Sequence, residues 1–319
     1  MLHHGQVVYT YRDAGFGLRQ PHIWASMTKS VTGLLVSQFI AEGMLDPAAR
    51  LATYVPELAG TPFGESTVEQ NLNMQVAVVY PEGVPPDLGL FAATGLIPRK
   101  PGMPGDIYTF LKIAQLASGD ADKGLFYYQN GSPEALAWAL RRLSGQTWSE
   151  LVTQRLWSRF AQDNAYVQVD ELGTEMASGG ISCSLLDTAR FAELVRREAA
   201  APGPGDSLRQ AVHALLQPGG NQQAFAHGNL AQGREGYAYR RYWYQKNDAD
   251  GSFEASGRFG QKLYINPRRE VVIVKLSATP DVSRRATSAS GGANVAAREI
   301  DSHGAFNVMV DALLGALPH

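Results

Sequence analysis

The sequence has very little cysteine: Cys183 is the single cysteine among 319 residues. One cysteine excludes an internal disulfide, a CxxC redox pair and a cysteine-rich zinc site. The sequence also lacks an excess of charge of one sign, because 28 Lys and Arg residues stand against 30 Asp and Glu residues. No block of basic residues is present, so we expect neither nucleic acid nor a membrane surface as a partner.

Long hydrophobic runs are missing as well. No apolar stretch reaches the roughly 18 residues that a membrane-spanning helix needs. The first residues lack the basic-then-apolar order of a signal peptide, so we expect a cytoplasmic protein, although a trimmed N-terminus could have carried an export signal. The apolar fraction of 45% and the charged fraction of 18% are typical of a globular protein with a sizeable core.

The predicted elements change character along the chain. A β-rich segment at 5–15 precedes residues 26–44, in which apolar side chains recur at helical spacing. Several helices are expected in the middle of the chain, where capping boxes begin at Ser66 and Thr147. Another helix there is expected to have Ser132 as its N-cap, because a proline follows at the first helical position.

The last third of the chain has a different composition. Residues 237–278 are rich in aromatic and β-branched side chains separated by turn formers, which predicts an antiparallel meander, and 305–317 predicts a closing helix. This segregation indicates an α+β fold: an antiparallel sheet flanked by helices, with an inserted, mostly helical region. We predict a discontinuous sheet domain of residues 1–60 and 175–319, and a helical domain of residues 61–174.

The first candidate for chemistry is the pair Ser26 and Lys29. Residues three apart share one helix face, so the hydroxyl and the amine can approach each other. A serine is a poor nucleophile until a base removes its proton, and a lysine that loses solvation can become such a base. The helix N-terminus adds backbone N–H groups where an oxyanion would form. The structural alternative is an N-cap serine followed by a surface lysine.

Two more segments carry candidate groups. Tyr128 and Asn130 precede the predicted helix at Ser132, where a phenol could shuttle a proton and an amide could hold a carbonyl group. Their structural alternative is a packed aromatic cluster with a turn asparagine. In the segment 257–267, glycines beside a strand would let a substrate approach the backbone, and an edge N–H could complete an oxyanion hole with that of Ser26. The alternative there is a β-bulge.

Together these motifs resemble those of the β-lactamase and penicillin-binding serine hydrolases, in which S-x-x-K opens a helix and a glycine-bearing strand comes late in the chain. Tyr128 lies 102 positions after Ser26, and a Y-x-N motif at about this distance is similar to class C β-lactamases and related esterases. The resemblance extends to the branch of 6-aminohexanoate-dimer hydrolases and family VIII carboxylesterases. Its blocks are "WASMTKSVTGLLV", "FYYQNGSPEALAWAL", "GGISCSLLDTARFAEL" and "GRFGQKLYINPRREVVIVKLS".

The resemblance implies a β-lactamase/transpeptidase-like fold and a mechanism without metal or cofactor. Ser26 would be the acylated nucleophile, and Lys29 and Tyr128 would form its base and proton relay. The N–H groups of Ser26 and Gln261 would make the oxyanion hole. Asn130 would bind the substrate carbonyl or support Lys29.

Further substrate contacts are expected from Tyr80, Arg258 and Gly260. Arg258 stands where the superfamily commonly has Lys or His. Arginine stays charged, so it can pair with a carboxylate but cannot act as a titrating base. This weakens the case for β-lactam hydrolysis and leaves room for a substrate with a terminal carboxylate. Equally, Arg258 can be a plain surface charge, and both interpretations stay open at this point.

We therefore predict a serine hydrolase that cleaves small esters or linear amides, such as aminohexanoate oligomers, through an acyl-enzyme on Ser26. One alternative is a β-lactamase or D-amino peptidase, and another is a non-catalytic, ligand-binding relative. The expected partner is a small-molecule ester or amide. The segment before Ser26 is short for this branch, so a second subunit could supply the missing wall, and a homodimer is a possible assembly.

Overall fold

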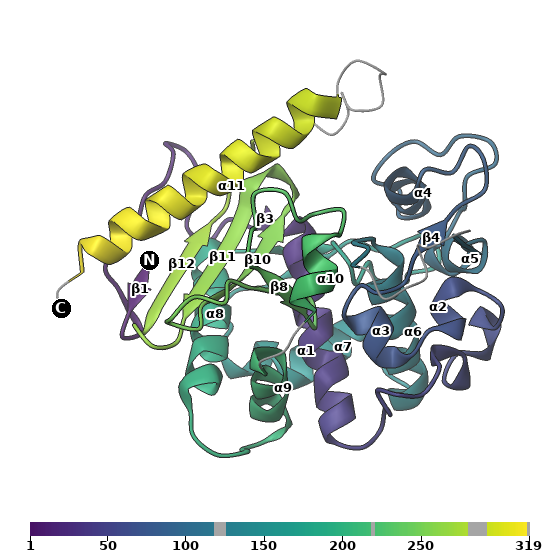
Figure 1. Ribbon diagram of the computed structural model, residues 1–319, viewed down its shortest axis with the longest axis horizontal. Coiled ribbons are helices and arrows are strands. Elements are labelled where there is room, and N and C mark those ends of the chain that lie inside the picture. Colours follow the sequence, from purple (N-terminus) through teal and green to yellow (C-terminus); the bar gives the residue numbers. More distant parts are fainter. Residues whose placement is uncertain (118–125, 218–220, 280–291, 318–319) are drawn as a thin grey trace.

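The computed structural model describes residues 1–117, 126–217, 221–279 and 292–317. Its centre is a seven-stranded antiparallel sheet in the order β2-β1-β12-β11-β10-β9-β8 (Figure 1). Strands β8 to β12 each pair with the next along the chain, which is the predicted meander, and β1 joins the edge of β12. The strands are β1 (Leu2–His3), β2 (Gln6–Val7), β8 (Ala238–Arg240), β9 (Trp243–Gln245), β10 (Phe253–Gly257), β11 (Gln261–Asn266) and β12 (Val271–Lys275).

Two small sheets connect this sheet to the helices. One contains β3 (His22–Ile23), β7 (Ile181–Cys183) and β6 (Tyr166–Val167), and the other pairs β4 (Val78–Val79) with β5 (Gln115–Leu116). The α-helices are α1 (Thr28–Ala41), α2 (Pro62–Glu65), α3 (Val68–Leu72), α4 (Pro86–Ala93), α5 (Ile107–Lys112), α6 (Gly131–Ser144), α7 (Trp148–Arg155), α8 (Leu185–Ala200), α9 (Ser207–Leu216), α10 (Gln222–Ala226) and α11 (Gly292–Gly315). The short 3-10 helices include η1 (Ala25–Met27), η3 (Pro56–Leu58) and η6 (Arg258–Gly260).

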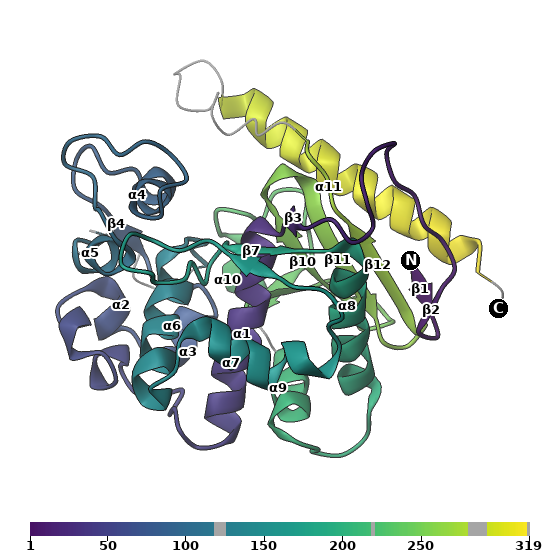
Figure 2. The ribbon, with the colours of Figure 1, turned by 180° about the vertical axis from the view of Figure 1, so that it is seen from behind.

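Helices cover both faces of the main sheet. Alternate side chains of a strand point to opposite faces, so Leu263 and Ile265 of β11 join the main core while Tyr264 faces the other way. On that second face Tyr264 packs with Phe306 and Val310 of α11, which crosses the sheet (Figure 1). Seen from behind, α8 lies over β11 and β12 (Figure 2). The sheet is therefore the middle layer of a three-layer arrangement.

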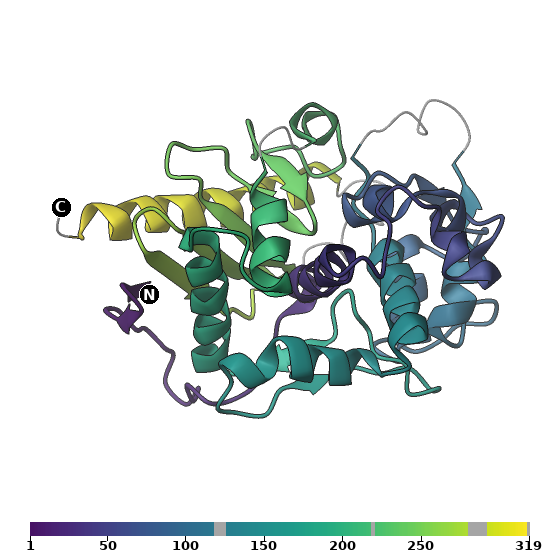
Figure 3. The ribbon, with the colours of Figure 1, turned by 90° about the horizontal axis from the view of Figure 1, so that it is seen from below.

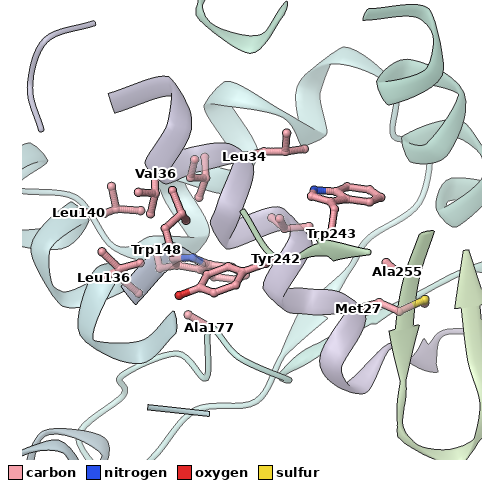
Figure 4. Close-up of a cluster of buried hydrophobic side chains, with 14 of the residues drawn as sticks. Met27, Leu34, Val36, Leu136, Leu140, Trp148, Ala177, Tyr242, Trp243 and Ala255 are labelled. Atoms are coloured by element: carbon pink, nitrogen blue, oxygen red, sulfur yellow. The ribbon is translucent and has the colours of Figure 1, made fainter. Parts of the chain in front are cut away.

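Helix α1 runs through the interior between the sheet and the helical region. Residues 28–39 are all buried, so this helix has no polar face, as is typical of a core helix. Figure 4 shows Leu136 and Trp148 on one side of α1 and Trp243 on the other. At Gly33 a side chain would collide with the backbone carbonyl of Arg241, so glycine permits this close packing. The start of α1 is thereby fixed at the junction of the two parts of the molecule.

The two ends of the chain lie at the sheet end of the molecule, and α2 to α6 lie at the opposite end (Figure 3). The predicted boundary after residue 60 falls between η3 and α2. The division into residues 1–60 with 175–319 and residues 61–174 stays a prediction. Among the described helices, none combines the length and the apolar character that crossing a membrane requires.

Some local predictions were wrong by one or a few residues. The first capping box is made by Thr67 and Gln70 and not by Ser66, while the box at Thr147 is confirmed. Ser132 is not an N-cap, because α6 starts at Gly131, two residues before the predicted start, and the Gln129 side-chain oxygen accepts the N–H groups there. The β-rich segment 5–15 contributes only two residues to the sheet, and its remaining side chains are mostly exposed.

Candidate active site

The turn that carries Ser26 is fixed by its neighbours. The Trp24 N–H donates to the Ile181 carbonyl oxygen at 2.8 Å, and its buried indole N–H donates to the Thr188 hydroxyl at 2.8 Å. Ala25 then takes a left-handed φ of 48°, which costs a non-glycine residue about 1–2 kcal/mol. This turn directs the chain into η1 and α1. Ser26 is not an N-cap, because the cap positions are Trp24 for η1 and Met27 for α1.

Lys29 is a core residue and not a surface lysine, since only 1% of it is exposed. Its Nζ donates to the Ser26 Oγ at 3.1 Å, to the Asn130 Oδ1 at 2.7 Å and to the Ser178 carbonyl oxygen at 2.8 Å. These three contacts use the three N–H bonds of an ammonium group. Burial lowers the pKa of Lys29 from 10.5 to about 7. Near neutral pH, the amine therefore exists in both protonation states.

The partners of Lys29 determine what its neutral form can do. A neutral amine has two N–H bonds and one lone pair, so one of the three contacts must reverse its direction. The Asn130 Oδ1 and the Ser178 carbonyl oxygen can only accept, whereas the Ser26 hydroxyl can donate. Loss of the proton therefore turns the lone pair toward Ser26. That arrangement is what a general base beside a nucleophile requires.

Tyr128 lies beside the same amine. The Lys29 Nζ is 5.2 Å from the centroid of the Tyr128 ring. The Asn229 side chain holds the Tyr128 backbone through two hydrogen bonds. The Tyr128 N–H donates to Asn229 Oδ1 at 2.8 Å, and Asn229 Nδ2 donates to the Tyr128 carbonyl oxygen at 3.0 Å. The ring also packs at a tilt against Phe126 and edge-on against Tyr239, so the aromatic cluster that was the structural alternative exists as well. The two interpretations of this segment are compatible.

The end of β10 approaches the turn of Ser26 directly. A side chain at Gly257 would collide with the Trp24 carbonyl oxygen, so this glycine brings the strand against the turn. Gln261 pairs with Gly257 across β10 and β11 and is fully buried. Its side chain donates to the Ser277 carbonyl oxygen at 2.6 Å and accepts the Ser277 N–H at 2.9 Å, which braces the loop. The backbone of Gln261 therefore lies on the strand next to Gly257, the residue that packs against the turn before Ser26.

Arg258 is not a free surface charge. Its guanidinium donates to Asp87 Oδ2 at 3.3 Å and lies 5.0 Å from the centroid of the Phe91 ring. Gly260, two residues on, has a left-handed φ of 84°, and its carbonyl oxygen accepts the Lys275 ammonium at 3.2 Å. The conformation of η6 therefore requires this glycine. Whether Gly260 also contacts a substrate stays a prediction.

Tyr80 has a buried hydroxyl for which the described residues provide no hydrogen-bond partner. Its ring stacks on Phe110 with centroids 4.6 Å apart. Burial, and to a smaller extent the charge of Asp87, raises the pKa of Tyr80 well above its ordinary value of 10. The hydroxyl therefore keeps its proton at physiological pH, and an incoming acceptor group would satisfy it.

The sequence did not point to Asp87, Glu134 or Ser178 as members of this site. The buried Glu134 carboxylate accepts the N–H groups of Ala177 at 3.0 Å and Ser178 at 2.8 Å, which holds the carbonyl that Lys29 contacts. Burial raises the pKa of Glu134, and these hydrogen bonds oppose the rise. One signal existed, because the acidic Glu134 lies in the first turn of the helix that follows the Y-x-N motif. The roles of Asp87 and the Ser178 carbonyl depend on contacts distant in sequence.

No group of three or more His, Cys, Asp or Glu side chains among the described residues is arranged to hold a metal ion. The expectation of an enzyme without metal or cofactor stays a prediction.

Comparison with known proteins decides the family. The sequence profile of the beta-lactamase family matches residues 1–296. The chain belongs to the beta-lactamase family. Its relatives include the 6-aminohexanoate-dimer hydrolase of Paenarthrobacter ureafaciens, which is 33% identical over 290 residues, covering 89% of this chain and 73% of that protein.

Solved structures agree with this family assignment. A Bacillus anthracis protein, provisionally assigned as a 6-aminohexanoate-dimer hydrolase, has a TM-score of 0.81 at 29% identity, covering 100% of this chain and 79% of that chain. A family VIII carboxylesterase has a TM-score of 0.57 at 14% identity, covering 82% of this chain and 78% of that chain. The second likeness concerns the fold alone. The predictions of the family, of the β-lactamase/transpeptidase-like α+β fold and of a hydrolase are confirmed.

Proposed function

We propose that this member of the beta-lactamase family hydrolyses small esters or linear amides through an acyl-enzyme on Ser26. The observation that carries the proposal is the environment of Lys29. Its Nζ lies 3.1 Å from the Ser26 Oγ, and that hydroxyl is the member of its three partners that can donate a proton back. The lowered pKa of Lys29, about 7, lets a neutral amine exist at physiological pH.

In the first half-reaction, the Ser26 Oγ forms a bond to the substrate carbonyl carbon as its proton passes to the Lys29 Nζ. The negative charge on the carbonyl oxygen is held by the backbone N–H groups of Ser26 and Gln261. The carbon–oxygen or carbon–nitrogen bond of the substrate then breaks. The leaving group takes the proton from Lys29 by way of the Tyr128 hydroxyl, which is restored in the same step.

In the second half-reaction, water attacks the acyl carbon and gives a proton to the neutral Lys29 amine, again with Tyr128 as the relay. The bond between the acyl carbon and the Ser26 Oγ breaks, and this oxygen takes the proton back. Asn130 and the Ser178 carbonyl oxygen keep the amine aimed at Ser26 throughout. The products are a carboxylic acid and an alcohol or amine.

The residues near Ser26 and the names of the relatives support the proposed substrate class. Two relatives are named as 6-aminohexanoate-dimer hydrolases, which favours a short linear amide. We propose that the Tyr80 hydroxyl donates to the substrate, and that Arg258 and the backbone near Gly260 contact its distal end. Because Arg258 is paired with Asp87, a substrate carboxylate would have to compete with that ion pair.

A covalent probe tests the nucleophile. The wild-type protein is expected to react with a fluorophosphonate, and Ser26→Ala is expected to lose this labelling while remaining folded. Ser30→Ala is the matched control, since the Ser30 hydroxyl donates to the Tyr242 carbonyl oxygen, within the core. Labelling of Ser26→Ala at the wild-type rate would reject the assignment.

A second candidate function is that of a β-lactamase or D-amino peptidase, and the family supports it in general terms. Arg258 speaks against it, because a guanidinium cannot replace a titrating base. Parallel assays with nitrocefin and p-nitrophenyl butyrate separate the two, and faster nitrocefin turnover would favour the β-lactamase. A non-catalytic binder would instead acylate slowly without release, which intact-mass spectrometry detects. The cytoplasmic location and a homodimer remain proposals from the sequence.

A further inference from the structure

A line of polar contacts leads from Lys29 to the surface of the molecule. The Asn130 side chain accepts from the Lys29 Nζ through Oδ1 at 2.7 Å and donates through Nδ2 to Asp87 Oδ1 at 2.7 Å. The other carboxylate oxygen of Asp87 accepts from Arg258 at 3.3 Å. Asp87 lies in the first turn of α4 and Arg258 lies in η6, so the carboxylate joins the helical region to the sheet.

We infer that Asp87 is a positioning residue, which orients the Asn130 amide toward Lys29 and, through its ion pair with Arg258, ties α4 to η6. This inference rests on the proposed role of Lys29 as the base for Ser26. The comparisons assign no role to Asp87, and its contacts give it no direct access to Ser26.

The argument for orientation follows from the chemistry of the amide. A carboxylate can only accept hydrogen bonds, so Asp87 requires the NH₂ group of Asn130 on its side. The amide oxygen must then face Lys29, where it holds one N–H bond of the amine. Without Asp87 the amide can turn over and direct its NH₂ group at the amine. The Lys29 lone pair would then be drawn toward Asn130 and away from Ser26.

The argument for charge concerns every element packed around Lys29. Four groups face its amine: Asp87 from α4, Glu134 from α6, Arg258 from η6 and the Tyr128 ring from the loop before α6. Burial is the main cause of the lowered pKa of Lys29; Asp87 and Glu134 oppose it, and Arg258 adds to it. Asp87 and Arg258 thus act on Lys29 in opposite directions. Removing the charge of Asp87 should therefore lower the pKa of Lys29, and removing the charge of Arg258 should raise it.

The test is the pH dependence of kcat/KM for p-nitrophenyl butyrate in four variants. Activity should rise with pH as Lys29 loses its proton. Asp87→Asn keeps an oxygen for the Asn130 amide but removes the charge, so the rise should move to lower pH by about half a unit. Arg258→Gln should move it to higher pH by a similar amount. In Asp87→Ala the rise in activity should also move to lower pH. In addition, kcat should fall by about tenfold to a hundredfold, because the Asn130 amide is no longer held in place.

Glu82→Gln is the matched control, because it removes one negative charge from an exposed position on the loop before α4. Its profile should coincide with that of the wild type. The inference is overturned if the pH profile of Asp87→Asn matches that of the wild type or moves to higher pH. It is also overturned if the maximal activity of Asp87→Ala equals that of Asp87→Asn. If either result is found while Ser26 is still labelled by a fluorophosphonate, only the role of Asp87 is rejected. If Ser26→Ala is labelled as the wild type is, the proposed function itself is rejected.

Discussion

Replacing Lys29 with methionine should change how the stability of the folded protein depends on pH. The pKa of Lys29 falls from 10.5 to about 7 on burial, so keeping its charge in the core costs roughly 5 kcal/mol. Methionine is unbranched, has a similar length and carries no charge. It leaves two acceptors, the Asn130 Oδ1 and the Ser178 carbonyl oxygen, without their donor, at about 1–3 kcal/mol each. At pH 6, the expected net change in the free energy of unfolding therefore lies between a loss of about 1 kcal/mol and a gain of about 3 kcal/mol.

The pH dependence of the stability difference between the two proteins does not depend on the lost hydrogen bonds. Above pH 7 the folded protein releases the Lys29 proton, while the unfolded chain holds it until about 10.5. The unfolded state then binds more protons, so the stability of the wild type rises relative to that of the variant by about 1.4 kcal/mol per pH unit. Below pH 7 both states are protonated, and the difference between the two proteins should be constant.

Urea unfolding of both proteins at each pH from 6 to 10 measures this difference, provided that the transitions are two-state with equal slopes. Lys112→Met, at an exposed position in the last turn of α5, is the control and should run parallel to the wild type. Parallel curves for Lys29→Met and the wild type from pH 7 to 10 would refute a lysine that titrates near 7. The same variant should lose fluorophosphonate labelling.

Three other substitutions test separate parts of the account. Gly257→Ala should abolish labelling of Ser26 in a folded protein, because the added methyl group collides with the Trp24 carbonyl oxygen; circular dichroism provides the folding control. Tyr128→Phe should lower kcat by about 10²–10⁴ with unchanged urea stability, as measured by steady-state kinetics. Leu136→Ala, fully buried beside α1, should lower the free energy of unfolding by about 2–5 kcal/mol in urea titrations.

Local sequence patterns predicted some helix starts and missed others. The capping box at Thr147 follows from a short-range rule and is present at the start of α7. The start of α6 did not follow, because its N–H groups are accepted by the Gln129 side chain from the preceding loop. A rule that looks for Ser or Thr at the cap position cannot anticipate that the side-chain amide of Gln129, before the helix, accepts these N–H groups.

The site was predictable where its chemistry is local. Ser26 and Lys29 are three residues apart, so helical geometry alone brings them together. Asp87 was not predictable, since its partners Asn130 and Arg258 lie 43 and 171 positions away. The orientation of Arg258 was open for the same reason: the sequence gives its charge, while its partner depends on how α4 packs against η6.

The most direct test of the central claim is to locate the acyl group chemically. The protein is mixed with p-nitrophenyl butyrate at mildly acidic pH, quenched in acid within the first turnover, digested and mapped by tandem mass spectrometry. The account predicts a butyryl adduct on Ser26 that is absent from Ser26→Ala and strongly reduced in Lys29→Met. An adduct on another residue, or turnover in Ser26→Ala at the wild-type rate, would contradict it.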